Sequence, residues 1–170
     1  MIVLGIDPGT AATGYGIVTD HSGQGEPRGS LSLIECGVIR TAPRDGLSVR
    51  LCGLYDEMRA IIARHKPDVL AIEDVFYAKN VRTTVVLGHA RGVLLLAAQQ
   101  SGLVISEYPP AEIKKTVVGA GGATKEQVQF MVARLLRLKS APQPNDAADG
   151  VAAALAHLLT ARVPRLERTR

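Results

Sequence analysis

The chain has 170 residues, of which 46% are hydrophobic and 21% charged, and its formal net charge is +4. This length fits one domain, and the many apolar residues exclude a disordered chain. We expect neither a transmembrane helix nor a secretory signal peptide, because no charge-free apolar run reaches about 20 residues and Asp7 interrupts the first one. With only Cys36 and Cys52, the protein is expected to be cytoplasmic, with reduced thiols and no membrane partner.

Three strands are expected first, at residues 2–7, 14–18 and 31–40, forming an antiparallel meander. An amphipathic helix follows over residues 47–65. The rest of the chain alternates between the two kinds of element: a strand at 69–73, a helix at 81–100 capped by Asn80, a strand at 103–106, a short helix at 111–116, a helix from the capping box of Thr124 and Gln127 to about Leu138, and a helix capped by Asn145 that reaches about Ala161.

This order predicts an α/β fold with a five-stranded mixed sheet, in which three antiparallel strands are followed by two parallel ones, flanked by helices. Residues 1–161 are expected to form a single domain. Residues 162–170 have no core-forming pattern and are expected to be a basic, mobile tail.

Charge is distributed unevenly along this domain. Residues 79–139 carry nine basic and three acidic side chains, whereas residues 1–78 carry seven basic and ten acidic ones. A basic middle segment beside isolated acidic residues suits a polyanion held over a metal site. Solvated arginines on an ordinary protein surface would give the same distribution, so charge alone does not decide.

Four acidic side chains are placed where they can meet. Asp7 and Glu73 each end an apolar strand, and parallel neighbouring strands bring their carboxyl ends to one edge of a sheet. Asp146 and Asp149 share one face in the first turn of the last helix. The alternative for this last pair is a simple interaction with the helix dipole.

Such a cluster needs a cation, because close carboxylates repel each other by about 4 kcal/mol per pair. Oxygen-only ligands favour Mg²⁺, with Mn²⁺ as a substitute. Two such ions, about 3.5–4 Å apart, are what phosphodiester hydrolysis uses. We therefore expect two Mg²⁺ ions per active site.

Four segments occur in an order and spacing that a known family shares: Gly5-Ile-Asp7-Pro-Gly-Thr10, Ile72-Glu73-Asp-Val-Phe76-Tyr-Ala-Lys79-Asn80, Lys114-Lys-Thr-Val-Val-Gly119 and Asn145-Asp146-Ala-Ala-Asp149. Over residues 1 to about 160 the chain resembles RuvC, the family of bacterial Holliday junction resolvases. The resemblance implies a ribonuclease-H-like fold and a homodimeric, Mg²⁺-dependent crossover junction endodeoxyribonuclease. Such an enzyme resolves four-way DNA junctions in recombination and repair by paired symmetric nicks with 5′-phosphate products. It also implies RuvA and RuvB as branch-migration partners.

The resemblance assigns roles to particular residues. Its metal-binding and catalytic acids fall on Asp7, Glu73, Asp146 and Asp149, and its catalytic basic residues fall on Lys114 and Lys125. Residues expected to contact DNA are Phe76, Tyr77, Lys79, Lys114 and Lys125. An aromatic side chain such as Phe76 can stack on an unpaired base near the crossover. Ordinary core packing is the alternative for Phe76, and a half-buried position explains Tyr77 equally well.

The expected helix at 81–100 is apolar around nearly all of its circumference, so both of its sides need cover. Gly88 and Gly92 would let another backbone approach closely, and the simplest partner is the same helix of a second subunit. The alternative is a helix enclosed within the monomer.

Two rival functions belong to other classes. Asp7-Pro-Gly-Thr10 with Gly14-Tyr-Gly16 resembles the phosphate-binding hairpin of actin-like and sugar-kinase ATPases, but those proteins enclose the nucleotide between two such domains. A non-catalytic junction-binding module is the second rival, and it would not need the acidic cluster.

Overall fold

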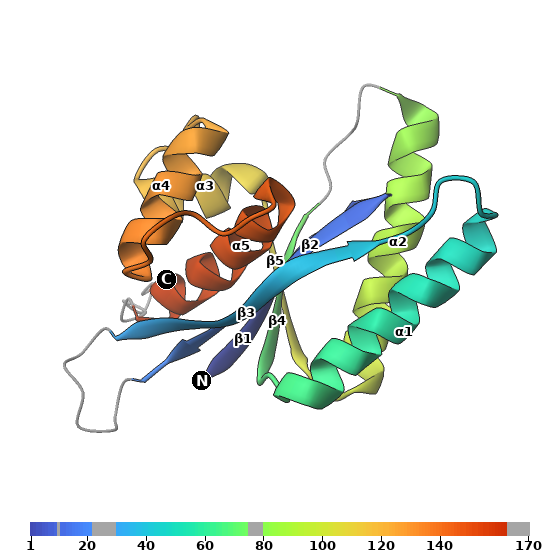
Figure 1. Ribbon diagram of the computed structural model, residues 1–170, viewed down its shortest axis with the longest axis horizontal. Helices are drawn as coiled ribbons and strands as arrows, with labels where there is room; N and C mark the ends of the chain where they lie inside the picture. Colours follow the sequence, from blue (N-terminus) through green and yellow to red (C-terminus); the bar gives the residue numbers. More distant parts are fainter. Residues whose placement is uncertain (10, 22–29, 75–79, 163–170) are drawn as a thin grey trace, which may run out of the picture.

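A five-stranded mixed sheet forms the centre of the protein in a computed structural model, which describes residues 1–9, 11–21, 30–74 and 80–162 (Figure 1). The strand order is β3-β2-β1-β4-β5. The first three strands are antiparallel, and β4 and β5 run parallel to β1. The predicted sheet is thus confirmed, with these bounds: β1 (Ile2–Asp7), β2 (Ala12–Asp20), β3 (Leu31–Arg40), β4 (Val69–Glu73) and β5 (Val104–Tyr108).

Helices cover both faces of this sheet (Figure 1). One face carries α1 (Leu47–His65) and α2 (Val81–Gln100), and the other carries α3 (Pro110–Val118), α4 (Lys125–Leu135) and α5 (Asn145–Arg162). Two hydrophobic clusters result, one on each face. A sheet covered on both faces needs apolar residues along its central strands, which is the composition of β1 and β4 up to their last residues, Asp7 and Glu73.

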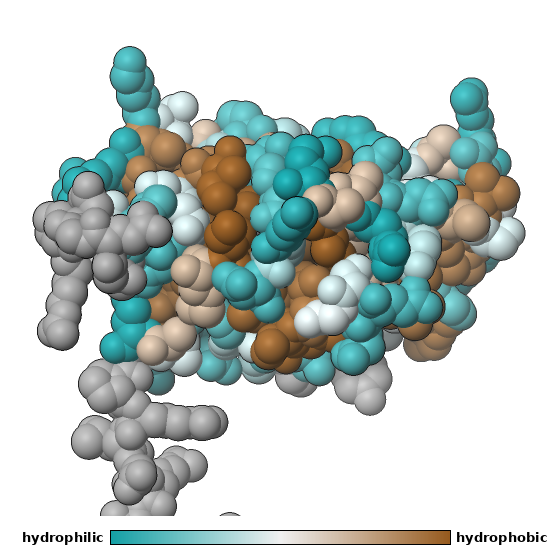
Figure 2. Space-filling model, turned by 90° about the horizontal axis from the view of Figure 1, so that it is seen from below, coloured by the Kyte–Doolittle hydropathy of each residue, from teal (hydrophilic) through white to brown (hydrophobic). Residues whose placement is uncertain are grey.

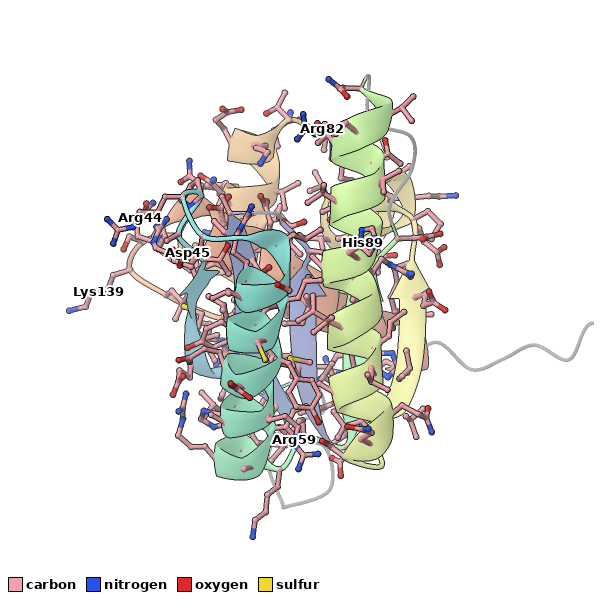
Figure 3. The ribbon with its side chains drawn as sticks, turned by 90° about the vertical axis from the view of Figure 1, so that its right-hand side faces the viewer. Arg44, Asp45, Arg59, Arg82, His89 and Lys139 are labelled. Carbon is pink, nitrogen blue, oxygen red and sulfur yellow. The ribbon has the colours of Figure 1, made fainter. Side chains whose placement is uncertain are left out.

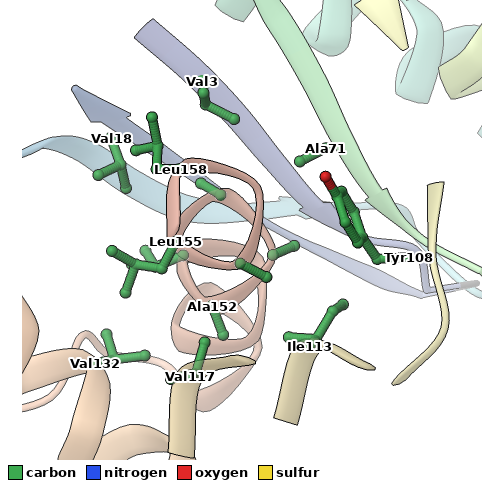
Figure 4. Packing of buried hydrophobic residues seen from close by; sticks show 14 of the residues in the cluster. Val3, Val18, Ala71, Tyr108, Ile113, Val117, Val132, Ala152, Leu155 and Leu158 are labelled. Carbon is green, nitrogen blue, oxygen red and sulfur yellow. The ribbon is translucent and has the colours of Figure 1, made fainter. Parts of the chain in front are cut away.

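Side chains along β1 alternate between the two faces of the sheet, so the strand contributes residues to both clusters. Val3 packs on the α5 face, whereas Leu4 and Ile6 pack on the α1/α2 face. On the α5 face, Val3 and Val18 lie beside Leu155 and Leu158 of the helix (Figure 4). Residues of odd number in β1 therefore face α5.

Helix α2 has the length and composition of a membrane-spanning helix. Its buried residues are Ala90, Leu94, Ala97 and Ala98, which belong to the cluster between the sheet and the α1/α2 layer. Core helices of globular proteins pass the same test of length and composition.

Two predicted helix ends are wrong. Helix α4 ends at Leu135, because Arg137 takes a left-handed conformation (φ 53°) and Leu138 N–H donates to the carbonyl of Ala133 at 2.9 Å, as in a Schellman motif. Asn145 is the first residue of α5 and not its cap. Ala147 N–H bonds there to the carbonyl of Pro144 at 2.9 Å.

The last helix extends to the first residue of the predicted tail. Arg162 is the last residue of α5, and its guanidinium pairs with the Asp20 carboxylate at 2.7 and 2.9 Å. The remainder of the predicted tail, 163–170, lies outside the described residues.

Candidate metal centre

Strand alternation decides where the two strand-end acids point. Asp7 has the same parity as Val3 in β1, and Glu73 has the same parity as Val69 and Ala71 in β4, so all of them face α5. The parallel register pairs Ile6 with Ile72, the residues immediately before the two acids. Asp7 and Glu73 therefore end neighbouring strands on the same face of the sheet.

Glycines bring the first turn of α5 onto this face. A Cβ atom on Gly14 would lie 1.8 Å from the backbone oxygen of Asp146, and one on Gly5 would lie 2.1 Å from that of Gly150. On the helix side, a Cβ on Gly150 would lie 2.6 Å from the Cα of Tyr15. Backbone thus contacts backbone between β1, β2 and α5, at a distance that only glycine permits. Without this contact the acids of α5 could not reach Asp7.

The contact gathers three of the four predicted acids. Asp7, Asp146 and Asp149 can each offer one carboxylate oxygen, and these oxygens lie within 4.8 Å of one another. Glu73 lies outside that set but lines the same cavity of about 180 Å³, whose polar walls are Asp7, Glu73, Lys114, Lys125 and Asp149. The structure therefore brings all four predicted acids and both predicted lysines to one place.

Electrostatics in the cavity oppose full ionisation. Burial, then the charges of Glu73 and Asp149, raise the pKa of Asp7 to about 7. Burial, then the charge of Asp149, raise the pKa of Glu73 to about 6, against the lowering influence of Lys114 and Lys125. These shifts mean that the site favours additional positive charge at neutral pH.

Part of that positive charge comes from lysine side chains. Lys125 Nζ donates to Asp149 Oδ2 at 2.9 Å, and this hydrogen bond raises the pKa of Lys125. Its place at the start of α4 is fixed by the predicted capping box, in which Thr124 and Gln127 bond to each other's backbone N–H groups. Lys114 enters the same cavity from α3.

The donor set fits a hard divalent cation. Every candidate ligand atom is a carboxylate oxygen, and such oxygens bind Mg²⁺, Mn²⁺ or Ca²⁺ in proteins. A cation would also relieve the repulsion that raises the pKa of Asp7. Asp7, Asp146 and Asp149 could hold the ion directly, with Glu73 at the edge of the set.

Sequence reasoning missed the glycines that seat α5, although a signal for them exists. Gly14 and Gly16 recur at a spacing of two in a strand, and α5 is rich in alanine. Small residues on two facing elements permit close packing. The three predicted DNA contacts Phe76, Tyr77 and Lys79 lie outside the described residues.

Comparisons with known proteins identify the family to which the chain is similar. A family model described as "Crossover junction endodeoxyribonuclease RuvC" matches residues 3–157. The protein of that name from Pelotomaculum thermopropionicum is 48% identical to the chain over 157 residues, 92% of either chain.

The chain is also similar to solved structures of RuvC proteins. Thermus thermophilus RuvC superposes with a TM-score of 0.85 at 34% identity, covering 95% of this chain and 96% of that one. The T. thermophilus RuvC in complex with a Holliday junction substrate gives 0.87 at 32% identity and covers 95% of both chains. These likenesses confirm the predicted ribonuclease-H-like fold.

Proposed function

The chain belongs to the RuvC family of crossover junction endodeoxyribonucleases, and from this premise we propose that it resolves four-way DNA junctions at a Mg²⁺ centre formed by Asp7, Glu73, Asp146 and Asp149. The observation that carries the proposal is the convergence of the Asp7, Asp146 and Asp149 carboxylates within 4.8 Å. Two of them, Asp7 and Asp149, line a cavity that Glu73 also lines. Relatives named as junction endonucleases and a junction-bound structural neighbour support the substrate.

The acids and the lysines have different roles in this proposal. Asp7, Asp146 and Asp149 would hold the metal, and Glu73 would supply charge from the neighbouring strand. Two bound Mg²⁺ ions, or Mn²⁺ in their place, would supply Lewis-acid activation of water and neutralise charge on the phosphodiester. Lys114 and Lys125 stabilise the charge that develops on the phosphate, and Asp149 holds the ammonium group of Lys125 in place.

Contacts to the junction extend beyond the metal. Phe76, Tyr77 and Lys79 follow Glu73 closely in the sequence, and we assign to them contacts with the junction. We assign to Phe76 the stacking on an unpaired base near the crossover. The products are nicked duplexes with 5′-phosphates.

A homodimer completes the proposal, because a four-way junction is nearly two-fold symmetric and needs two sites on opposed strands. The outer side of α2 exposes Val81, Val85 and Leu96. Among the described residues, no heavy atom lies within 4 Å of a would-be Cβ on Gly88 or Gly92, and we assign this side to contact with a second copy of the chain. We further propose that the dimer acts in the cytoplasm with RuvA and RuvB.

Both rival functions lose support. Gly14 and Gly16, which suggested a phosphate-binding hairpin, instead contact the backbone of α5. A non-catalytic binding module would have no need of the four acids that converge here.

The test is cleavage of a synthetic four-way junction by the purified protein. Cleavage should require Mg²⁺, stop on addition of a chelator and yield paired nicks with 5′-phosphates. Asp7→Asn should lose more than 10²-fold in cleavage rate, because it removes a metal ligand. Junction binding should persist, because the variant also lacks a negative charge that repels the phosphates. Asp56→Asn, an equal change on the exposed side of α1, is the control and should cleave normally. Full activity in Asp7→Asn would contradict the proposed centre.

A further inference from the structure

Arg91, on α2, reaches across to the ends of β4 and β5. Its Nε donates to the backbone oxygen of Glu73 at 3.4 Å. Its Nη2 pairs with the Glu107 carboxylate and lies 3.4 Å from the Asp74 carboxylate. The side chain is only 15% exposed, although both of its acidic partners lie largely at the surface.

These contacts reach the candidate metal centre from the opposite face of the sheet. Glu73 faces α5 with its side chain, whereas Arg91 approaches from the opposite, α1/α2 face and touches the main chain of Glu73. The strand end is also held by Asp74 N–H, which donates to the Tyr108 carbonyl at 2.8 Å. Arg91 therefore joins a helix to the last residue of the strand that carries a candidate ligand.

We propose that Arg91 is a positioning residue that fixes Glu73 for metal binding through its backbone carbonyl and the neighbouring carboxylates. The proposal rests on the proposed function, since it assumes that Glu73 serves the metal. Arg91 does not touch the reacting atoms.

Arginine suits this role better than any other cation. Its planar guanidinium offers several N–H donors in a fixed arrangement, so one side chain can serve the Glu73 carbonyl, Asp74 and Glu107 together. A lysine ammonium keeps the charge but not this arrangement. Groups that orient metal ligands in this way typically change metal affinity or activity by 10–100-fold when removed.

The experiment compares three changes at this position with a distant control. Arg91→Met removes the contacts and the charge, Arg91→Lys keeps the charge, and Arg91→Met combined with Glu107→Gln leaves the net charge unchanged. Arg59→Met, at the far end of the α1/α2 layer from Arg82, is the control (Figure 3). Mn²⁺ affinity of the DNA-free protein is measured by calorimetry, alongside melting temperature and the Mg²⁺ concentration for half-maximal junction cleavage.

Arg91→Met should bind Mn²⁺ about ten-fold more weakly and need correspondingly more Mg²⁺. The charge-balanced double variant should lose a similar factor, Arg91→Lys should lose less, and Arg59→Met should match the unmodified protein. A lower melting temperature with unchanged Mn²⁺ affinity in both Arg91→Met and Arg91→Lys would make Arg91 purely structural and overturn the proposal. Glu73→Gln separates the two hypotheses: if it binds Mn²⁺ and cleaves normally, the proposed role of Glu73 fails, and this proposal with it.

Discussion

The carboxyl group of Asp7 is subject to opposite demands from folding and from metal binding. Its pKa rises to about 7, mainly through burial and then through the charges of Glu73 and Asp149. In the unfolded chain an aspartic acid titrates near 4. The folded protein thus holds the proton more tightly, so the group favours folding fully below about pH 4, and this contribution is lost as the pH rises through about 7.

Asp7→Asn should therefore stabilise the metal-free protein at pH 8 and change it little at pH 3.5. The gain in the free energy of unfolding at pH 8 is at most on the order of 4 kcal/mol, from a shift of about three pKa units. Urea unfolding in the presence of a chelator at both pH values measures it. Added Mg²⁺ should stabilise the unmodified protein at pH 8 and the variant much less.

The exposed Asp56 on α1 supplies the comparison, because Asp56→Asn makes the same change of side chain away from the acidic cluster. A metal-free Asp7→Asn protein that is less stable than the unmodified one at pH 8 would mean that the Asp7 carboxylate makes favourable contacts that outweigh its burial.

At the scale of elements, the seating of α5 on β1 and β2 decides whether a site exists. Asp146 and Asp149 reach Asp7 because Gly14 and Gly150 let the two backbones touch. Packing stability and metal binding therefore depend on the same contact, and a side chain placed between strand and helix should damage both.

Gly16→Ala tests this dependence. A Cβ at Gly16 would lie 2.4 Å from Val151 Cγ2 and 2.7 Å from its Cα, so α5 must move away. We expect a loss of about 1–3 kcal/mol in the free energy of unfolding, together with weaker Mn²⁺ binding. Urea unfolding and calorimetry measure the two effects.

Gly53→Ala, in the middle of α1, is the matched change in open space, because none of the residues that the structure describes comes within 4 Å of a would-be Cβ there. It should stabilise the protein by roughly 0.5–1 kcal/mol, since alanine favours helix over glycine. Equal stability effects in the two variants would show that α5 does not depend on glycine at the sheet.

At the scale of the whole molecule, one side of α2 exposes apolar side chains. Val85 and Leu96 are exposed on α2, and His89 points outward beside them (Figure 3). Seen from below, hydrophobic residues also reach the surface in bands between hydrophilic ones (Figure 2). Exposed apolar residues along one helix are typical of an interface.

Gly88→Leu should weaken association of two copies without unfolding either one, because a Cβ on Gly88 would meet no atom within 4 Å in the part of the chain that the structure describes. Sedimentation at a series of concentrations should show a dimer dissociation constant at least ten-fold higher, while the circular dichroism spectrum is unchanged. Paired nicking of a junction should fall with it, since a single bound copy cuts one strand. Gly53→Leu on α1 is the control, and an unchanged dimer in Gly88→Leu would place the interface elsewhere.

The secondary structure and several site residues can be predicted from the sequence alone. Strands and helices follow from periodicity, and the acids Asp7 and Glu73 are recognisable because each ends an apolar strand. Four segments with family spacing are sufficient to indicate the nuclease. Local signals suffice here because each depends on neighbouring residues only: alternation, capping and the spacing of acids in one helical turn.

Other features were decided by the tertiary structure. The end of α4 depends on the left-handed conformation of Arg137, and the residues next to it in the sequence do not predict this conformation. Contacts of Gly14 with Asp146, and of Arg91 with Glu73, join residues far apart in the chain. Which side chains meet across a sheet depends on how closely two backbones approach, and that distance is set by the packing of the whole core and by no local pattern.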